Sequence, residues 1–357
     1  MRIAFYSNQL SERGTETALI DYAVENERIL HNQSVLIFPK NKILDKHRFE
    51  LLSHTFEIFL FENIDELNSY LKDAHIDLFY CIVPGRSEDI ADKITTTKTF
   101  VHSVFDLSRK HGDIYSAIHP YLNKAFHTDF PVLPHIVKKC HDTQETLRKE
   151  LCIPNDALVF GSYAGKDRFD IQLAHEAIKK VAKSFTHTNK IFFLFMNIDN
   201  FIEKECPSEQ FDNIIFLPGS TDLEYKQRFI NTCNAMIHAR SDGETFGLSI
   251  GEFSISGKPV ITYKPGLLRN IKSIIKWTLK KHYTYAKAHI MNLGKKGIYY
   301  SSKRQLEKIL TNSSLWGGVS ITPPYSKNYY DCFSEKFSAE KVMAIFNKLI
   351  HSIDKGA

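Results

Sequence analysis

Two carboxylates and a glycine, spaced around the start of a predicted helix, are the residues of this sequence that most suggest chemistry. Glu244 and Glu252 lie eight positions apart, and Gly247 lies between them. The pattern predicts a loop up to Gly247, a short helix after it and an apolar strand at 260–262. The first amides of a helix have no partner within it and lie at the positive end of its dipole. This stretch therefore predicts an anion site.

A phosphate and a sugar can be recognised together at such a helix. Gly247 lets a phosphate approach the backbone because it has no side chain, and a carboxylate before the helix can accept hydrogen bonds from sugar hydroxyls. Glu252 lies roughly 8 to 12 Å further along at about 1.5 Å per residue, which suits a ribose beyond the phosphates. The alternative is an amphipathic helix with two surface glutamates. Gly243, Gly247 and the strand that follows favour the phosphate interpretation.

This stretch resembles the signature of the retaining GT-B glycosyltransferases of family 4. That signature is a glutamate, then Gly-Phe-Gly or a close variant, then a second glutamate eight positions after the first, and here Thr245 stands where Gly is commonest. The resemblance implies that Glu244 contacts hydroxyls of the transferred sugar and that Glu252 holds the nucleotide ribose. The distal phosphate would be bound by the amides of Phe246, Gly247 and Leu248.

The resemblance also implies an α/β chain with the GT-B fold, in which two Rossmann-like, doubly wound lobes face a cleft. The length agrees, because 357 residues exceed what one hydrophobic core usually holds. We place an acceptor lobe at 1–135, a linker at 136–155 and a nucleotide-sugar-binding lobe at 156–336. Proline and charged residues accumulate in the linker. The last helix, within 337–357, is expected to pack back on the first lobe.

The N-terminal part begins with a strand, a glycine turn and a helix, the unit that faces phosphates in an open α/β sheet. Gly14 and Thr15 stand at this turn, between a strand at 2–7 and a helix at 15–30. A single loop glycine is a weak signal. The turn and its following Glu16 resemble the glycine-rich turn of family 4 enzymes, which faces the donor phosphates and the acceptor.

Further apolar runs alternate with helical stretches, as in a parallel doubly wound sheet. They lie at 34–38, 57–61, 78–83 and 99–104. Ligands bind at the carboxyl ends of such strands, where a histidine would be exposed. His102 and His111 are the candidates, and a histidine hydrogen-bonded in the interior is the alternative. In family 4 a histidine often closes a strand here and points at the donor sugar, so the resemblance favours His102 over His111.

The second lobe offers cations for a diphosphate. Lys166 and Arg168 lie in a predicted strand-to-helix turn, and two cations there can neutralise a diphosphate when no metal is present. Family 4 supplies an Arg directly after the glycine and a Lys shortly beyond, but Ser162 occupies the first place here. Whether Lys166, Arg168 or both serve stays open, as does the alternative of solvated loop cations. The turn from Leu217 to Gly219 is where family members contact the base.

The composition indicates an ordinary globular protein. Hydrophobic residues make up 43% and charged residues 24%, and no run of about 18 apolar residues could span a bilayer. The six cysteines and sixteen histidines lack metal-ligand spacing, so we expect no metal and no cofactor beyond the donor substrate, a UDP- or GDP-sugar. The N-terminal apolar run is too short for a signal peptide, and we expect a cytoplasmic protein.

One window is strongly basic. Lys264 to Lys296 holds nine Lys or Arg and no Asp or Glu, although the whole chain carries only +5. Four of its cations fall along one side of a predicted helix: Arg269, Lys272, Lys276 and Lys280. Residues 266–296 could rest on anionic lipid head groups, or they could form a solvated helix. A basic stripe also attracts nucleic acid, but we expect no specific nucleic acid partner.

The sequence thus predicts a metal-independent, retaining transferase that moves a sugar from a nucleoside-diphosphate sugar to a glycan or another hydroxyl acceptor. No side chain stands out as a covalent nucleophile, so the acceptor is expected to attack from the face of the leaving group. The alternatives are a catalytically silent nucleotide-binding protein with the same fold, an epimerase and a DNA glucosyltransferase. The expected catalytic residues are Glu244, His102, Lys166 and Arg168. The expected donor-binding residues are Gly14, Thr15, Leu217, Gly219, Phe246, Gly247, Leu248 and Glu252.

Overall fold

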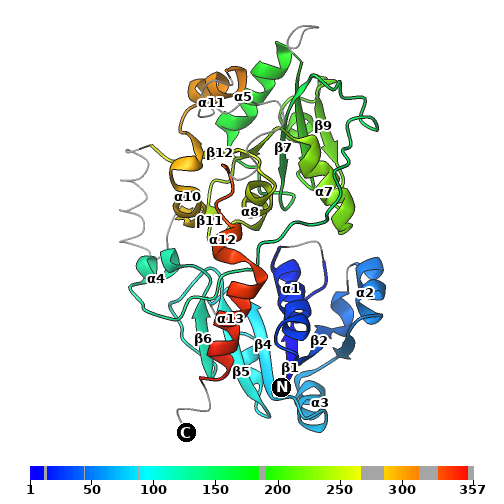
Figure 1. Cartoon of the computed structure of the whole chain (residues 1–357), viewed down its shortest axis with the longest axis vertical. Helices are drawn as coiled ribbons and strands as arrows, with labels where there is room; N and C mark the ends of the chain where they lie inside the picture. Colours follow the sequence, from blue (N-terminus) through cyan, green and yellow to red (C-terminus); the bar gives the residue numbers. More distant parts are fainter. Residues whose placement is uncertain are drawn as a thin grey trace. The chain divides into compact units, whose positions relative to one another are not determined.

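The chain divides into two compact units. The computed structural model describes residues 1–11, 14–43, 45–86, 88–184, 190–266, 285–312 and 329–352. Unit 1 is Met1–Ile136 with Lys336–Ala357, and unit 2 is Val137–Glu335. Each unit is built on a six-stranded sheet in which every pair of neighbouring strands is parallel (Figure 1). The expected α/β class with two parallel-sheet domains is confirmed.

The sheet of unit 1 has the order β3-β2-β1-β4-β5-β6. Its strand order therefore reverses direction between β1 and β4, which is where open α/β sheets bind ligands. The strands are β1 Arg2–Tyr6, β2 Gln33–Pro39, β3 Glu57–Phe61, β4 Leu78–Val83, β5 Lys98–Ser103 and β6 Ile114–Ala117. The helical elements are α1 Gly14–Arg28, η1 Lys40–Lys42, α2 Lys46–Ser53, α3 Ile64–Asp73, η2 Ile90–Lys93, α4 Pro120–Phe126 and α13 Ala339–Ile350.

The central strand β1 explains why this unit folds around its sheet. Ile3, Ala4 and Phe5 are fully buried, because a strand covered on both faces needs apolar residues at consecutive positions. Ile3 pairs with Ser34 of β2 on one side and with Leu78 of β4 on the other. The apolar runs predicted at 34–38, 57–61, 78–83 and 99–104 are confirmed as strands, within one residue at either end.

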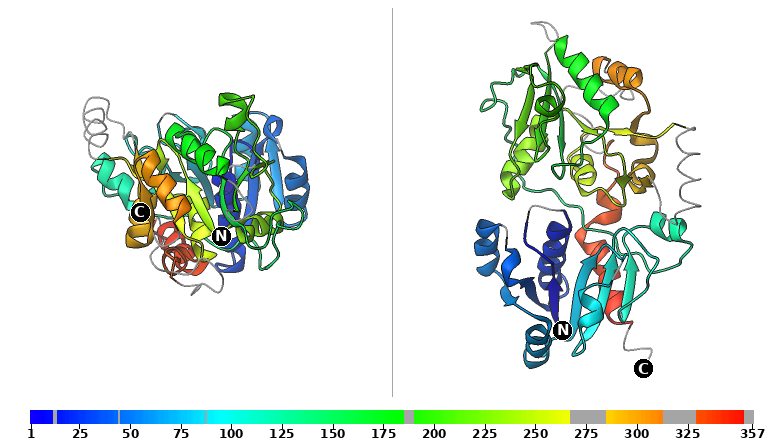
Figure 2. Two further views of the ribbon diagram at one scale, coloured as in Figure 1. Left: turned by 90° about the horizontal axis from the view of Figure 1, so that it is seen from above. Right: turned by 180° about the vertical axis from the view of Figure 1, so that it is seen from behind.

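The sheet of unit 2 has the order β14-β12-β10-β7-β8-β9, and β11 pairs with β13 in a separate two-stranded ladder. The strands are β7 Leu158–Tyr163, β8 Ile191–Met196, β9 Ile214–Leu217, β10 Ala235–His238, β11 Gly243–Glu244, β12 Val260–Tyr263, β13 Ala286–Lys287 and β14 Ile298–Tyr300. The helical elements are α5 Gln172–Lys183, α6 Phe201–Glu205, α7 Leu223–Thr232, α8 Leu248–Ile255, α10 Ala288–Leu293, η3 Gly294–Lys296, α11 Lys303–Thr311 and α12 Ser334–Phe337. Helices α5 and α11 lie side by side (Figure 2).

Much of the segment expected as a linker, 136–155, packs on unit 2. Leu147 and Ile153 are buried, although charged residues surround them in the sequence. Arg148 holds the segment, because its guanidinium donates to the carbonyl of Pro154 at 2.8 Å and to Asn234 Oδ1 at 3.0 Å. The first of these bonds satisfies a backbone carbonyl that a free linker would leave to water.

Helix α13 completes the core of unit 1 with chain from the C-terminal end (Figure 1). Phe346 is fully buried. Its ring centroid lies 5.4 to 6.4 Å from those of four aromatic residues of the N-terminal part, Phe5, Tyr22, Tyr80 and Phe100. Rings at these separations contribute both buried area and aromatic contact energy.

We therefore expect Phe346→Ala to destabilise unit 1 by about 3–5 kcal/mol, because the change leaves a cavity among four rings. The exposed Lys348 on the same helix provides the control, and Lys348→Ala should change stability by less than about 0.5 kcal/mol. Urea unfolding of both variants measures the difference. Equal stabilities would mean that α13 does not hold this core.

Candidate functional site

The stretch around the two glutamates folds into the predicted loop, short helix and strand. Helix α8 begins at Leu248, and Gly247 is its N-terminal cap with φ 90°. This left-handed conformation favours glycine because a side chain would be strained there. The amides at a helix start that lack intrahelical partners are the cap and the first three residues. They belong to 247–250, so Phe246, one of the three expected phosphate-binding amides, lies just before the helix.

A close backbone approach fixes the loop that carries Glu244. Gly243 has φ 67°, and a Cβ at this position would lie 2.0 Å from the carbonyl oxygen of Ala286. Strand β11 can pair with β13 only because this glycine has no side chain. The pairing sets Gly243 opposite Ala286 and Glu244 opposite Lys287. The position of Glu244 is thus determined by the ladder, not only by its loop.

The side chains of Arg240 and His238 hold the carboxylate of Glu244. Arg240 Nη1 lies 2.8 Å from Oε2, and His238 Nε2 lies 3.3 Å from Oε1. The Glu244 side chain is 18% exposed, so it can still meet a ligand from one side. His238 ends β10, Arg240 follows in the loop, and Glu244 is the last residue of β11. Sequence reasoning missed Arg240 and His238.

A second layer supports His238. Its Nδ1 lies 2.9 Å from Thr262 Oγ1 of β12, and its ring centroid lies 5.1 Å from that of His289. His289 is fully buried, and its Nε2 lies 3.3 Å from the hydroxyl of Tyr285. These contacts fix the ring plane of His238, and through it one oxygen of Glu244.

The charges around Glu244 keep it ionised. Burial alone would raise its pKa, but Arg240, and then His238, outweigh burial and lower the pKa of Glu244 to about 2. Burial lowers the pKa of His289 to about 3, so that ring is neutral near neutral pH. Glu244 can therefore accept hydrogen bonds at physiological pH, and it has no proton to donate.

Glu252, inside α8, has a cationic partner of its own. Lys226 Nζ of α7 lies 2.8 Å from Glu252 Oε1, and the two side chains are only 15% and 11% exposed. The same ammonium lies 4.7 Å from the ring centroid of Tyr163, the last residue of β7. This cation–π contact and the ion pair together orient the Glu252 carboxylate.

The two candidate cations after β7 differ in their surroundings. Arg168 is committed to carboxylates, because its Nε lies 3.2 Å from Asp167 and its Nη1 lies 3.6 Å from Asp242. Lys166 is exposed and forms no ion pair with any residue that the structure describes. Asp170 ties this loop to the Glu244 loop, since it accepts a 2.7 Å hydrogen bond from the amide of Ser241. Lys166 is thus the more available cation.

The remaining unit 2 candidates lie at the end of β9. Leu217 is the last residue of that strand, and its carbonyl accepts a 3.1 Å hydrogen bond from the amide of Asn197. Gly219 follows two residues later and is partly exposed. Both residues lie at the carboxyl end of a parallel strand, which is the expected place for a bound base.

In unit 1, helix α1 begins at the predicted turn. Gly14 is its first residue, and Thr15 follows in the first turn. The hydroxyls of Ser11 and Thr15 donate to the carboxylate of Glu16 at 2.8 and 3.3 Å. Glu16 is buried. Its acceptors are therefore used within the turn, and residues 12–13 of the same loop lie outside the described residues.

The expected exposure of His102 is wrong. His102 lies inside β5 and is fully buried, with Nδ1 2.7 Å from the hydroxyl of Tyr80. Burial above all, and then the neighbouring His135, lower the pKa of His102 well below its usual range. Strand β5 continues to Ser103, so His102 precedes the strand end and points into the core of unit 1. The interior alternative is the one that the structure adopts.

His111, the second candidate, belongs to a polar cluster. Within the described residues, Asp89, Asp92 and His111 form the one group whose ligand atoms lie close enough, within 4.8 Å, to hold a metal ion. Arg109 forms a bidentate ion pair with Asp92 and is the main reason that the pKa of Asp92 falls to about 2. The guanidinium already supplies the positive charge that a metal would bring.

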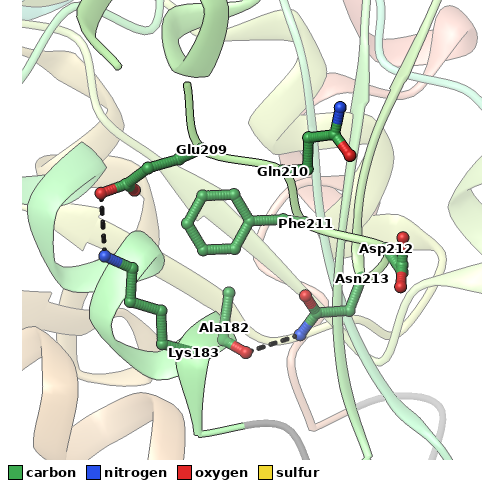
Figure 3. Close-up of a pocket in the computed structure, with 7 residues that line it drawn as sticks. All are labelled: Ala182, Lys183, Glu209, Gln210, Phe211, Asp212 and Asn213. Carbon is green, nitrogen blue, oxygen red and sulfur yellow. Dashed lines mark hydrogen bonds and ion pairs between the residues drawn. The ribbon is translucent and has the colours of Figure 1, made fainter. Parts of the chain in front are cut away.

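A pocket of about 280 Å³ in unit 2 contains none of the candidate residues. Lys183 and residues 209–213 line it, and the ring of Phe211 lies between the polar side chains (Figure 3). Lys183 Nζ lies 2.9 Å from Glu209, and the Asn213 amide donates to the carbonyl of Ala182 at 3.2 Å. Lys183 and Glu209 therefore pair with each other, and Asn213 is engaged by the backbone of α5.

Comparison with known proteins identifies the fold. No protein-family model matches the sequence, and no curated protein is detectably similar to it. A glycosyltransferase from Rickettsia africae is 12% identical, with a TM-score of 0.66 over 100% of this chain and 99% of that one. Anabaena HepE in complex with UDP-glucose is 15% identical, with a TM-score of 0.67 over 99% and 100%. WaaG, a glycosyltransferase involved in lipopolysaccharide biosynthesis, is 13% identical, with a TM-score of 0.58 over 99% and 100%. These similarities establish the GT-B glycosyltransferase fold.

Only part of the basic window 264–296 lies within the described residues. Residues 267–284, with the predicted helical cations Arg269, Lys272, Lys276 and Lys280, lie outside the described residues. None of the helices that the structure describes combines the length and apolar character needed to cross a membrane.

We expect Arg240→Met to raise the pKa of Glu244 by about 1–3 units, because its strongest cationic partner is lost. An NMR titration of isotope-labelled glutamate carboxyls measures this shift, with Glu244→Gln identifying the resonance. Arg304→Met, which removes an exposed arginine of α11, is the control and should leave the titration unchanged. In the wild type, the low pKa means that ionised Glu244 stabilises the fold above pH about 4.5, and this contribution is lost as the pH falls to about 2. An unshifted titration in Arg240→Met would contradict the assigned cause.

Proposed function

We propose that this chain is a retaining, metal-independent glycosyltransferase of the family 4 type. It would transfer a sugar from a UDP- or GDP-sugar to a glycan or another hydroxyl acceptor. The observation that carries the proposal is the pair of carboxylates, Glu244 and Glu252, on either side of the Gly247 helix start. The shared fold with HepE, a protein crystallised with UDP-glucose, supports the same donor class.

The donor diphosphate is assigned to the start of α8. When the glycosidic bond breaks, negative charge accumulates on the β-phosphate, and preorganised donors aimed at that charge lower the barrier. The amides at Gly247 and Leu248 and the ammonium of Lys166 supply these donors. Arg168 would take part once the diphosphate competes with Asp167 and Asp242 for its guanidinium.

The two glutamates have separate tasks in this proposal. Glu252 accepts hydrogen bonds from the ribose hydroxyls, and Lys226 keeps its carboxylate in place. Glu244 accepts hydrogen bonds from hydroxyls of the transferred sugar, for which its low pKa keeps it ionised. Leu217 and Gly219 lie where they could pack against the base. In these roles the carboxylates accept hydrogen bonds and the backbone amides donate them. No proton is transferred from the protein.

In the proposed retaining course, Glu244 does not act as a covalent nucleophile. Both of its oxygens are held by Arg240 and His238, so it is a poor candidate for a covalent nucleophile. The acceptor hydroxyl would therefore attack from the face that the diphosphate leaves. One C–O bond to phosphate breaks, a C–O bond to the acceptor forms, and the acceptor proton passes to the departing diphosphate. The sugar then keeps its anomeric configuration.

Unit 1 would bind the acceptor, and Gly14 and Thr15 stand at its turn between β1 and α1. His102 is left out of the reacting groups because it is fully buried. A cytoplasmic location and a peripheral contact of 266–296 with anionic membrane belong to the same proposal. No cofactor and no specific nucleic acid partner are part of it.

A catalytically silent nucleotide-binding protein is the second candidate. Two observations favour it: Ser162 replaces the arginine of family 4, and Arg168 is engaged by two carboxylates. Such a protein would bind the nucleotide sugar and consume none of it. Turnover of a bound donor in the presence of acceptor separates the two functions.

We expect Glu252→Ala to raise the dissociation constant for the free nucleotide by about tenfold or more, because two ribose hydrogen bonds worth about 1 kcal/mol each are lost. Glu244→Gln should abolish turnover and hardly change nucleotide affinity, since its partner is the sugar. The exposed Glu203 of α6 provides the control, Glu203→Ala. Isothermal titration calorimetry measures the affinities. An unchanged nucleotide affinity in folded Glu252→Ala would remove Glu252 from the ribose.

A thermal-shift screen against UDP-, GDP- and dTDP-sugars should yield one nucleotide that stabilises the protein by about 2.7 kcal/mol at a hundredfold excess over Kd. The product made with that donor should carry the donor's own anomeric configuration by NMR, and the reaction should proceed in EDTA. An inverted product, or activity that needs manganese after chelation, would overturn the retaining or the metal-independent assignment. Stabilisation without turnover of any acceptor would favour the silent binding protein.

A further inference from the structure

A second pocket of unit 2 has a composition unlike the first. Its volume is about 490 Å³, and it lies among η3, β14, α11 and residues 329–330. No carboxylate is present among the described residues that line it. Its polar and aromatic side chains are those of Lys295, Lys296, Lys308, Gln305, Tyr299, Tyr329 and Tyr330.

The lysines of this pocket have no carboxylate partner among the residues that the structure describes. Lys295 and Lys308 are exposed, and neither forms an ion pair with a residue that the structure describes. Lys296 is oriented by a 3.2 Å hydrogen bond to the carbonyl of Asp331, and its Nζ lies 5.9 Å from the ring centroid of Tyr329. Three ammonium groups around one concave space without a carboxylate attract an anion.

Lys264 adds to the positive field at this pocket. Lys264 Nζ lies 5.0 Å from the ring centroid of Tyr299, on the pocket wall. Burial, and then the charge of Lys264, lower the pKa of Lys287, which means that the two cations repel each other. The pocket would thus use part of the basic window 264–296, which the proposed donor site leaves unused.

The tyrosines give the pocket rigid, flat walls. The Tyr299 hydroxyl donates to the carbonyl of Gly294 at 2.6 Å, and a Cβ at Gly297 would lie 2.5 Å from that hydroxyl. The rings of Tyr329 and Tyr330 are perpendicular, with centroids 4.9 Å apart. Fixed aromatic faces beside polar groups are typical of small-molecule sites, and they suit the C–H faces of a sugar ring.

The pocket wall is also joined to helix α8. Ser254 Oγ donates to the carbonyl of Tyr330 at 2.7 Å and accepts from the amide of Cys332 at 2.9 Å. Ser254 is buried and lies two residues after Glu252. The backbone of the pocket is therefore held by the same helix that carries the proposed ribose contact, although none of the proposed donor residues lines the pocket.

We propose that this lysine- and tyrosine-lined pocket binds a phosphate group carried by a sugar. The lysines contact the phosphate oxygens, and the tyrosine rings pack against the sugar. The phosphorylated sugar could be free in solution, or it could be the head group of a membrane lipid, since the recognised chemistry is the same. This site is separate from the proposed donor site.

The test is calorimetric titration of the full chain with glucose 6-phosphate, together with sedimentation against phosphatidylcholine vesicles that contain phosphatidylinositol. Whichever of the two probes the wild type binds, the double variant Lys295→Glu with Lys308→Glu should weaken that binding by about tenfold or more, because two contacts to the anion become repulsive. Lys149→Glu, an exposed lysine of unit 2 outside the pocket, is the matched control and should bind like the wild type. Circular dichroism verifies that each variant is folded.

The outcomes separate this site from the donor site. Binding of glucose 6-phosphate that is lost in the double variant and kept in Glu252→Ala supports a pocket for free sugar phosphates. Binding of vesicles alone, lost in the same double variant, supports the lipid head group. No binding of either probe by the wild type, or binding that the double variant keeps, overturns the proposal. If the double variant does not fold, Tyr299→Ala with the same titrations replaces it.

Discussion

The candidate site depends on the charge balance around Glu244. A carboxylate with little exposure would tend to take up a proton, and Arg240 and His238 prevent this. The ladder between β11 and β13 keeps those partners in reach, and that ladder requires Gly243 because the Ala286 carbonyl lies where a side chain would be. One glycine and one arginine thus determine whether the carboxylate can act as a permanent acceptor.

Glu252, inside α8, has a cationic partner in the same way. Lys226 balances its charge, and Tyr163 positions the ammonium through its ring. Each carboxylate is therefore compensated separately, and ligand hydroxyls can bind without a change in the net charge of the site. A carboxylate has lone pairs for several donors, so a lysine on one oxygen leaves acceptor capacity for a ligand.

Much of the fold could be predicted from sequence because its strands are short, apolar and regularly spaced. The start of α8 was predictable for a local reason, since the glycine, the polar loop and the helical pattern are contiguous. Contacts between distant positions were not predictable. Lys226 meets Glu252 across 26 residues, and the two-residue strands β11 and β13 are too short for a periodic signal. His102 was misjudged because it lies within the apolar run 99–104, and the sequence does not reveal that Tyr80 of the neighbouring strand meets its ring in the interior.

Helix α13 has a consequence for synthesis on the ribosome. Unit 1 contains the first 136 residues of the chain, yet the ring of Phe346 fills the space between its aromatic side chains. Unit 2 is continuous and emerges before that helix. A nascent chain could therefore complete the second unit while the first still lacks part of its core, which reverses the usual order in which domains mature from the N-terminus. The N-terminal unit would then gain the last part of its core only after α13 has been synthesised.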